Sequence, residues 1–93
     1  MKIVTICGNG IGSSLMWGMK IEEILEEENI SGCTVESADF NSALSKGADL
    51  YVSVEELISQ LPNDVEKVVI RSYVNKKKIK EDVLEKIRSL INK

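Results

Sequence analysis

Short apolar runs alternate with amphipathic segments along the chain of 93 residues, and this alternation limits what it can fold into. Four runs predict strands at about residues 2–6, 33–37, 50–53 and 67–71. The intervening patterns predict helices at about residues 13–28, 54–61 and 78–91, with one helical turn near 42–44. Strands joined through helices require right-handed crossovers. We therefore predict an α/β fold: a doubly wound four-stranded parallel sheet, order 2-1-3-4, with helices on both faces.

The two long helices each show one apolar face. At about 100° per residue, one face of the first helix collects Trp17, Gly18, Ile21, Ile24 and Leu25. Its opposite face collects Glu22, Glu23, Glu26 and Glu27. The corresponding arc of the last helix contains Ile79, Val83, Leu84, Ile87, Leu90 and Ile91. These apolar faces are expected to pack on the sheet.

Helix-terminating signals accompany the predicted elements. Glu56 follows Ser53 by three residues, the capping-box pattern, and this predicts that Ser53 caps the short helix that follows. Gly32 is expected to provide the turn after the first helix.

Composition excludes several classes of function. A net charge of −3, with no basic stripe interleaved with aromatic residues, gives no reason to expect nucleic-acid binding. The chain has no apolar run near 18 residues, so no membrane insertion is expected. Two cysteines do not make a disulfide framework, and the first residues run directly into a strand. We therefore expect one cytoplasmic domain spanning residues 1–93.

Histidine is absent, which removes mechanisms that need a histidine base, a histidine metal ligand or a phosphohistidine within this chain. We expect no cofactor and no metal ion.

The predicted first strand runs into a cysteine, three glycines and a pair of serines. The segment reads Cys7, Gly8, Asn9, Gly10, Ile11, Gly12, Ser13 and Ser14. A dinucleotide fingerprint, a Walker A loop and a phosphatase cradle each require a glycine, lysine or arginine that this segment lacks. What remains is a glycine-rich loop of phosphate-cradle geometry that has no cation of its own.

Such a loop suits a thiolate and a phosphoryl group. Glycines let several backbone N–H groups converge on one point, and the positive end of the following helix faces the same place. Both effects favour the thiolate, which is the nucleophilic form of cysteine. Ser13 and Ser14 are expected to act as helix caps, as phosphate ligands or as both. The loop at 72–77 offers no aspartate as a general acid, so the sequence favours phosphoryl transfer over hydrolysis.

The segment Cys-Gly-Asn-Gly-x-Gly-Ser-Ser after a first strand resembles the active-site loop of IIB components of the bacterial phosphoenolpyruvate-dependent sugar phosphotransferase system. It is most similar to the ascorbate type. The resemblance implies that Cys7 accepts a phosphoryl group from a phosphohistidine on a IIA partner. It further implies that Cys7 donates this group to a sugar, here ascorbate, bound by the membrane IIC permease. Residues 8–14 would bind the phosphoryl group.

Three other functions stay open from the sequence. The first is a small cysteine phosphatase, which Ser13 disfavours by standing where arginine is expected. The second is a thiol redox module that pairs Cys7 with Cys33 across neighbouring strands. The third is a binding module with an unreactive loop. Cys33 alone is otherwise expected to be structural.

Some exposed candidates lie near the loop. Leu15, Met16 and Met19 fall outside the apolar face of the first helix, and methionine-rich surfaces suit changing partners. They are expected either to contact partner proteins or to pack under the segment 72–77. Arg71, after the fourth strand, is expected to approach the phosphoryl group or to form a surface ion pair.

Overall fold

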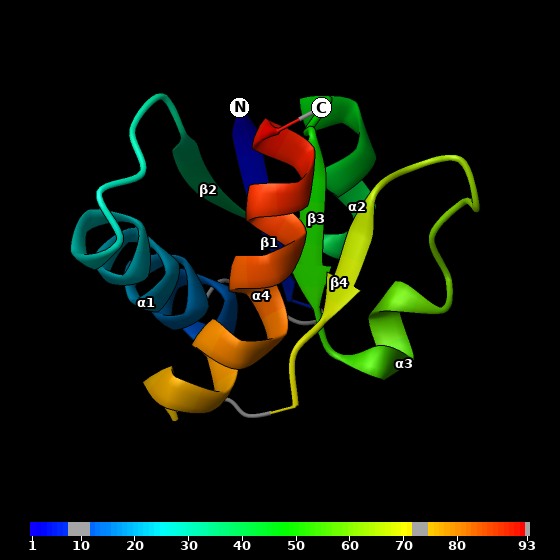
Figure 1. The fold of residues 1–93 in the computed structure, drawn as a ribbon. Helices are drawn as coiled ribbons and strands as arrows, with labels where there is room; N and C mark the ends of the chain where they lie inside the picture. The colour runs from blue at the N-terminus through cyan, green and yellow to red at the C-terminus, as the bar shows by residue number, and fades with distance from the viewer. Residues whose placement is uncertain (8–11, 72–74, 93) are drawn as a thin grey trace.

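The computed structural model describes residues 1–7, 12–71 and 75–92, except for the side chains at 12–14. Strands and helices alternate along these residues (Figure 1). The elements are β1 (Lys2–Cys7), α1 (Gly12–Glu27), β2 (Thr34–Asp39), α2 (Phe40–Ala43), the 3₁₀ turn η1 (Leu44–Lys46), β3 (Leu50–Ser53), α3 (Glu55–Ile58), β4 (Lys67–Val69) and α4 (Lys76–Ile91).

The four strands form one parallel sheet in the order β2-β1-β3-β4, which confirms the predicted fold class and strand order. β1 lies between β2 and β3, so its carboxyl end falls at the switch point of the sheet. Pairing of β1 with β2 extends from Lys2 and Thr34 to Cys7 and Asp39. Pairing of β1 with β3 extends only to Thr5 and Val52.

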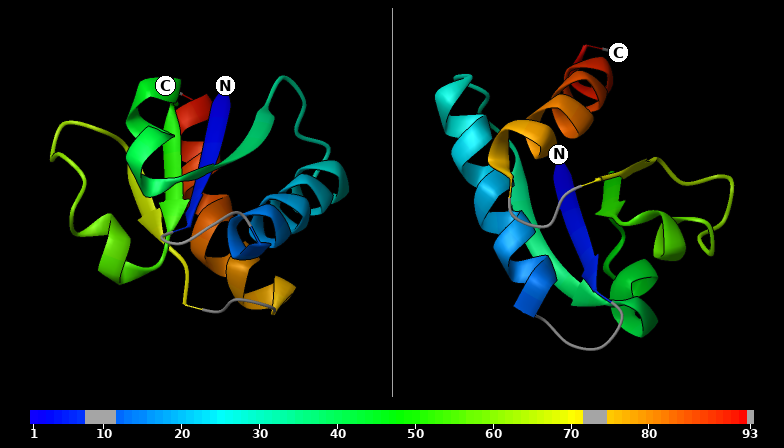
Figure 2. Two further views of the ribbon diagram at one scale, coloured as in Figure 1. Left: turned by 180° about the vertical axis from the view of Figure 1, so that it is seen from behind. Right: turned by 90° about the horizontal axis from the view of Figure 1, so that it is seen from below.

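Helices cover both faces of the sheet, as predicted. α1 and α4 lie over one face, and α2 and α3 lie over the other (Figures 1 and 2). Ile3 packs with Trp17, Ile21 and Ile79 on the first face. Val4, Ile6, Ala43 and Ile58 pack together on the second face. Because side chains alternate along a strand, Thr5 and Cys7 belong to the α1/α4 side of β1.

α1 lies against the sheet at Gly18. A Cβ atom there would stand 3.4 Å from Cγ1 of Val35 and 3.7 Å from Oγ1 of Thr5. Trp17 beside it is 2% exposed. The N-terminal half of α1 is thus packed directly against β1 and β2.

Several predicted boundaries shift for identifiable reasons. β2 covers 34–39 rather than 33–37 because it pairs with β1 along the whole of that strand. α4 begins two residues early because the side chain of Asn75 accepts a hydrogen bond from the Lys78 amide at 3.2 Å. β4 ends at Val69 rather than at about residue 71. α3 ends at Ile58 rather than at about residue 61, and turns follow it.

Two smaller expectations are confirmed and one is wrong. The helical turn predicted at 42–44 lies within α2 and η1, which together span 40–46. Gly32 has a positive φ of 81°, as expected of a turn residue after α1, and Asn29 is also in the left-handed region, with φ 57°. Ile91 remains 44% exposed because it lies in the last turn of α4, beyond the edge of the core.

Candidate functional site

Cys7 is the last residue of β1 and lies at the carboxyl edge of the sheet. Its side chain is partly buried and its thiol is free. α1 begins at Gly12, five residues later, and its first turn contains no acidic residue. The free N–H groups at the start of a 16-residue helix therefore meet no competing carboxylate from that turn. Residues 8–11 and the side chains of Ser13 and Ser14 lie outside the described residues.

Asp39 stands beside Cys7 in the sheet, because the two residues are register partners at the ends of β2 and β1. The hydroxyl of Ser42 donates a hydrogen bond to Oδ1 of Asp39. This bond is the main cause that lowers the pKa of Asp39 below its usual value. An ionised carboxylate thus lies on the β2 side of the cysteine.

Ser53 holds the same strand end from the β3 side. Its side chain is 0% exposed, and its hydroxyl donates a hydrogen bond of 2.7 Å to the carbonyl of Ile6. The expectation that Ser53 caps α3 is wrong. The N-cap is Val54, and no side chain caps that helix. Ser53 instead belongs to the surroundings of Cys7.

The start of α4 reaches the same edge of the sheet and begins with three lysines (Figures 1 and 2). Cations at a helix N-terminus oppose the helix dipole. Lys76 is compensated by ion pairs with Glu23 and Glu27, and the hydrogen bond with Glu27 is the main cause that raises its pKa. Lys77 and Lys78 are exposed and form no ion pair within the described parts of the chain. They place two cations without an ion pair in the described residues at this edge, and such cations attract an anionic partner.

Three apolar side chains in the first half of α1 remain exposed. Leu15 is 50% exposed, Met16 42% and Met19 57%. We call this set the α1 patch. The alternative that the three side chains pack under the segment 72–77 involves residues 72–74, which lie outside the described residues. The α1 patch presents apolar surface on the first half of the helix that follows Cys7 in the chain.

Arg71 follows β4 and is held by α4. Its Nε lies 2.8 Å from Oδ1 of Asp82, and its backbone amide donates to Oδ2 at 3.0 Å. Of the two expectations for Arg71, the surface ion pair is the one found.

Cys33 lies at the opposite end of the sheet from Cys7, which excludes a redox pair. Cys33 precedes Thr34, the register partner of Lys2, whereas Cys7 pairs with Asp39. Six residues of strand separate the two positions, or about 20 Å at about 3.3 Å per residue. A disulfide requires Cα atoms within about 7 Å. Cys33 packs against the core cluster of the α1/α4 face.

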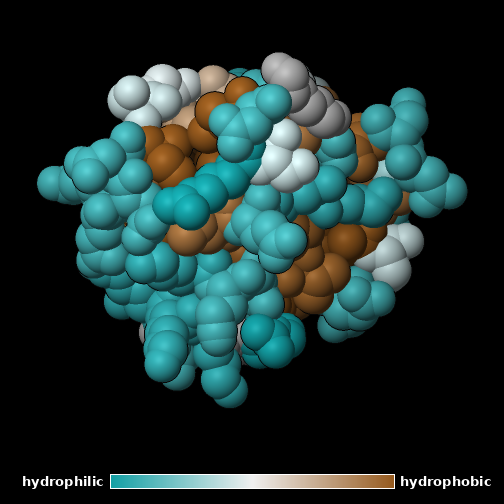
Figure 3. Space-filling view, viewed as in Figure 1, coloured by the Kyte–Doolittle hydropathy of each residue, from teal (hydrophilic) through white to brown (hydrophobic). Residues whose placement is uncertain are grey.

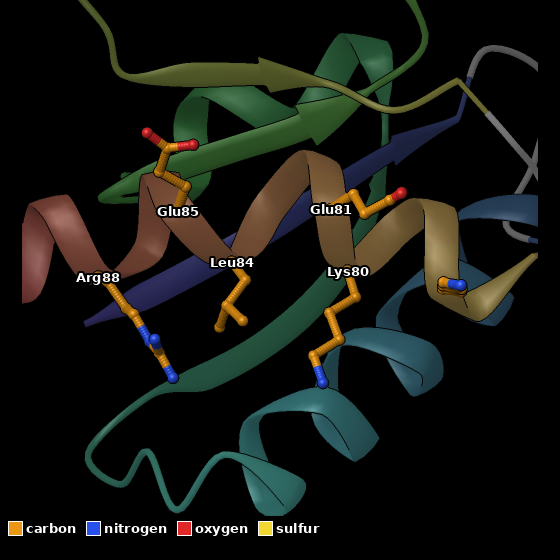
Figure 4. A pocket seen from close by; sticks show the side chains of 6 residues that line it. Lys80, Glu81, Leu84, Glu85 and Arg88 are labelled. Carbon is orange, nitrogen blue, oxygen red and sulfur yellow. The ribbon is translucent and has the colours of Figure 1, made fainter.

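The remaining surface near α4 offers a groove of about 520 Å³ along its outer face (Figure 4). Leu84 lies in a row between Lys80 and Arg88, and Glu81 and Glu85 point away from that row. Figure 3 shows a largely hydrophilic surface at the start of α4. The groove contains no cysteine. Within residues 1–7, 12–71 and 75–92, no cluster of three or more acidic or cysteine side chains could hold a metal ion.

Comparison with known proteins identifies the family. The sequence model described as "PTS system, Lactose/Cellobiose specific IIB subunit" matches residues 2–86. The chain belongs to this family. It is therefore a IIB subunit of a phosphotransferase system and a phosphocarrier, as the sequence predicted. Phosphotransferase partners of the IIA and IIC types follow in general from membership.

Relatives of this IIB subunit include the "Ascorbate-specific PTS system EIIB component" of Escherichia coli O157:H7 and that of Shigella flexneri. Each is 31% identical over 74 residues, which cover 75% of this chain and 70% of the relative. No helix of the described part of this IIB subunit is long and apolar enough to cross a membrane.

Sequence reasoning missed Asp39 and Ser53 as neighbours of the cysteine in this IIB subunit. One signal was available. Both residues end a predicted strand or follow it closely, and the carboxyl ends of parallel strands meet at one edge of the sheet. Ser53 also fitted a capping box, and that local pattern hid its longer-range contact.

Proposed function

We propose that Cys7 is the residue that carries the phosphoryl group in this IIB subunit. The observation that supports this most strongly is its position at the carboxyl end of the central strand, directly before residues 8–11 and the start of α1. Ligands of doubly wound folds bind at this point. Gly8, Asn9, Gly10, Ile11, Gly12, Ser13 and Ser14 are proposed to bind the phosphoryl group.

Transfer takes place in two displacements. The Cys7 thiolate attacks phosphorus of a phosphohistidine on the IIA partner, the N–P bond breaks and an S–P bond forms. The imidazole, protonated on its other nitrogen, leaves with the electron pair as neutral histidine. A sugar hydroxyl held by the IIC permease then attacks the same phosphorus and releases its proton to solvent. The S–P bond breaks, an O–P bond forms, and the thiolate is regenerated.

Features of the carboxyl edge support transfer between two partners. The N–H groups at the start of α1 and the cations Lys77 and Lys78 attract a dianionic group. The α1 patch of Leu15, Met16 and Met19 is proposed to contact first the IIA protein and then the IIC permease. The protein acts in this scheme as a single cytoplasmic domain that needs no cofactor.

The proposed sugar is ascorbate. Support comes from the relatives named as ascorbate-specific components and from the Cys-Gly-Asn-Gly-x-Gly-Ser-Ser segment. The family description names lactose and cellobiose, so these sugars are the necessary comparison. Membranes containing the cognate IIC permease should yield phosphorylated ascorbate when supplied with the phosphorylated IIB subunit. Formation of lactose or cellobiose phosphate instead would overturn the proposed sugar.

The site assignment is tested by labelling. With radiolabelled phosphoenolpyruvate, the general phosphotransfer proteins and the cognate IIA protein, label should appear on Cys7. Cys7→Ser should lose the label, whereas the matched variant Cys33→Ser should keep it because Cys33 lies at the other end of the sheet. Full labelling of Cys7→Ser would show that another residue carries the phosphoryl group.

A further inference from the structure

Among the described residues, the side chain of Ser53 reaches from β3 to the strand end that bears Cys7. Register pairing between β1 and β3 stops at Thr5 and Val52, two residues before the cysteine. On the other side of β1, pairing with β2 continues to Cys7 itself. The Ser53 hydroxyl, 2.7 Å from the carbonyl oxygen of Ile6, continues the attachment of β1 to β3 beyond the last register pair.

The position of Ser53 makes this contact rigid. Its side chain is 0% exposed, so no solvent competes for the hydroxyl. Its own carbonyl accepts a hydrogen bond of 2.8 Å from the Ile70 amide, directly after β4. Ser53 is therefore fixed between two strands. The alternative role, capping α3, is excluded because that helix has Val54 as N-cap and no side-chain cap.

The Ile6 carbonyl belongs to the peptide group that ends at the Cys7 nitrogen. Since a peptide group is planar, a hydrogen bond to its oxygen also fixes the direction of its N–Cα bond. That direction sets where the Cys7 side chain leaves the strand. We propose that Ser53 is a positioning residue for the nucleophile, and that it acts through the Ile6–Cys7 peptide to aim the Cys7 sulfur at the phosphoryl group.

This inference rests on the proposed function, in which Cys7 attacks a phosphohistidine. A positioning residue affects the chemical step more than the docking of the donor. Ser53 is buried whereas the α1 patch is exposed, so removing the Ser53 hydroxyl changes none of the side chains of the proposed docking surface. Misplacement of reacting atoms lowers the limiting rate, whereas loss of docking raises the donor concentration needed for half-saturation.

The test compares Ser53→Ala, Ser53→Thr and Tyr51→Phe. Threonine keeps the hydroxyl. Tyr51→Phe is the matched control because it removes a hydroxyl from a buried side chain of the same strand. The Tyr51 hydroxyl accepts a hydrogen bond from the Ala48 amide at 3.3 Å and donates one to the Leu44 carbonyl at 3.5 Å. Neither bond involves the strand end that bears Cys7. Single-turnover phosphorylation of Cys7 by the phosphorylated IIA protein is measured over a range of donor concentrations.

In Ser53→Ala the limiting rate should fall about tenfold while the half-saturating donor concentration stays unchanged. Ser53→Thr should recover most of the rate, and Tyr51→Phe should transfer at the wild-type rate. A wild-type limiting rate in Ser53→Ala would overturn the proposal. An equal loss in Tyr51→Phe would overturn it as well, because the effect would then be general destabilisation.

A second measurement separates this proposal from the proposed function. Alkylation of Cys7 by iodoacetamide, followed on its own peptide by mass spectrometry, requires no donor protein. Ser53→Ala should alkylate several times more slowly at Cys7, with Cys33 unchanged. If wild-type protein accepts no phosphate but this difference appears, the proposed function fails and the positioning role stands. Equal alkylation rates at Cys7 in Ser53→Ala and in wild type would overturn the positioning role of Ser53 and leave the proposed function unaffected.

Discussion

The outer face of α1 has two halves with opposite character. Near its start, the α1 patch of Leu15, Met16 and Met19 is exposed and apolar. Toward its end, Glu23 and Glu27 form ion pairs with Lys76 of α4, and the following Glu28 pairs with Lys80 and Arg88. The charged half is compensated within this molecule. The apolar half lies on the part of α1 that follows Cys7 most closely in the chain, and its exposed side chains are open to contact with another molecule.

One helix thus carries two different surfaces along its length. The charged half attaches α1 to α4, and the apolar half is the surface proposed to contact partners. The inner face, with Trp17, Ile21 and Ile24, is common to both halves and holds the helix on the sheet. Substitutions on these three surfaces should therefore affect different measured quantities.

The largest effect is expected from the inner face. Ile21→Ala should lower the free energy of unfolding by about 2–5 kcal/mol, because it removes a side chain that is 0% exposed and leaves a cavity. Urea denaturation measures the change. The exposed control Met19→Ala should stay within about 0.5 kcal/mol of wild type. A similar loss in both variants would mean that the inner and outer faces do not differ as described.

A smaller effect, on docking, is expected from the apolar half. Met19→Glu should raise the half-saturating concentration of the IIA donor about tenfold, equivalent to about 1.4 kcal/mol, and leave the limiting rate of Cys7 phosphorylation unchanged. A carboxylate there would also repel the incoming phosphoryl group. Glu22→Gln, further along the same helix, is the control and should leave the donor concentration unchanged. An unaltered value in Met19→Glu would remove the α1 patch from the docking surface.

The smallest effect is expected from the charged half. The hydrogen bond from Lys80 is the main cause that lowers the pKa of Glu28, and Arg88 adds to it. A carboxyl group with a lowered pKa in the folded state stabilises the fold above its unfolded pKa. It loses that contribution as pH falls through the folded value. Urea midpoints should therefore decline below about pH 4.5 at low salt.

Glu28→Gln is the matched control for this decline. It should reduce the acid-dependent part of the urea midpoint and leave Cys7 phosphorylation at neutral pH unchanged. High salt should weaken the difference between the two proteins, because exposed ion pairs are screened. An acid dependence that is the same in Glu28→Gln and in wild type would show that the Glu28 pairs contribute nothing.

Much of the fold could be predicted because its signals are periodic. The helical spacing of Trp17, Ile21 and Ile24 predicts a buried face without any knowledge of the residues that pack against it. The burial of all three side chains confirms this prediction. Alternation of strands with helices leaves few topologies, so the strand order also followed. The extent of β2 did not follow. It depends on pairing with β1, which no property of residues 33–39 specifies.

The site was predictable to a lesser degree. Cys7 stands out by its sequence context, and its place at the carboxyl end of β1 was expected. Asp39 and Ser53 reach it only through the sheet, across 32 and 46 positions of the chain. A short polar residue next to a helix start satisfies local rules for capping, so only the folded structure shows that Ser53 bonds to Ile6 instead.

Close packing at Gly18 has a consequence for how such proteins diversify. The distance of 3.4 Å from a Cβ at this position to Cγ1 of Val35 places α1 against the sheet six residues after the helix begins at Gly12. Sheet pairing fixes Cys7 in the same way. Both ends of the connection between them are thus set by packing elsewhere. Substitutions within that connection that keep its length would change the chemical group that can bind beside Cys7. The positions of β1 and α1 would stay the same.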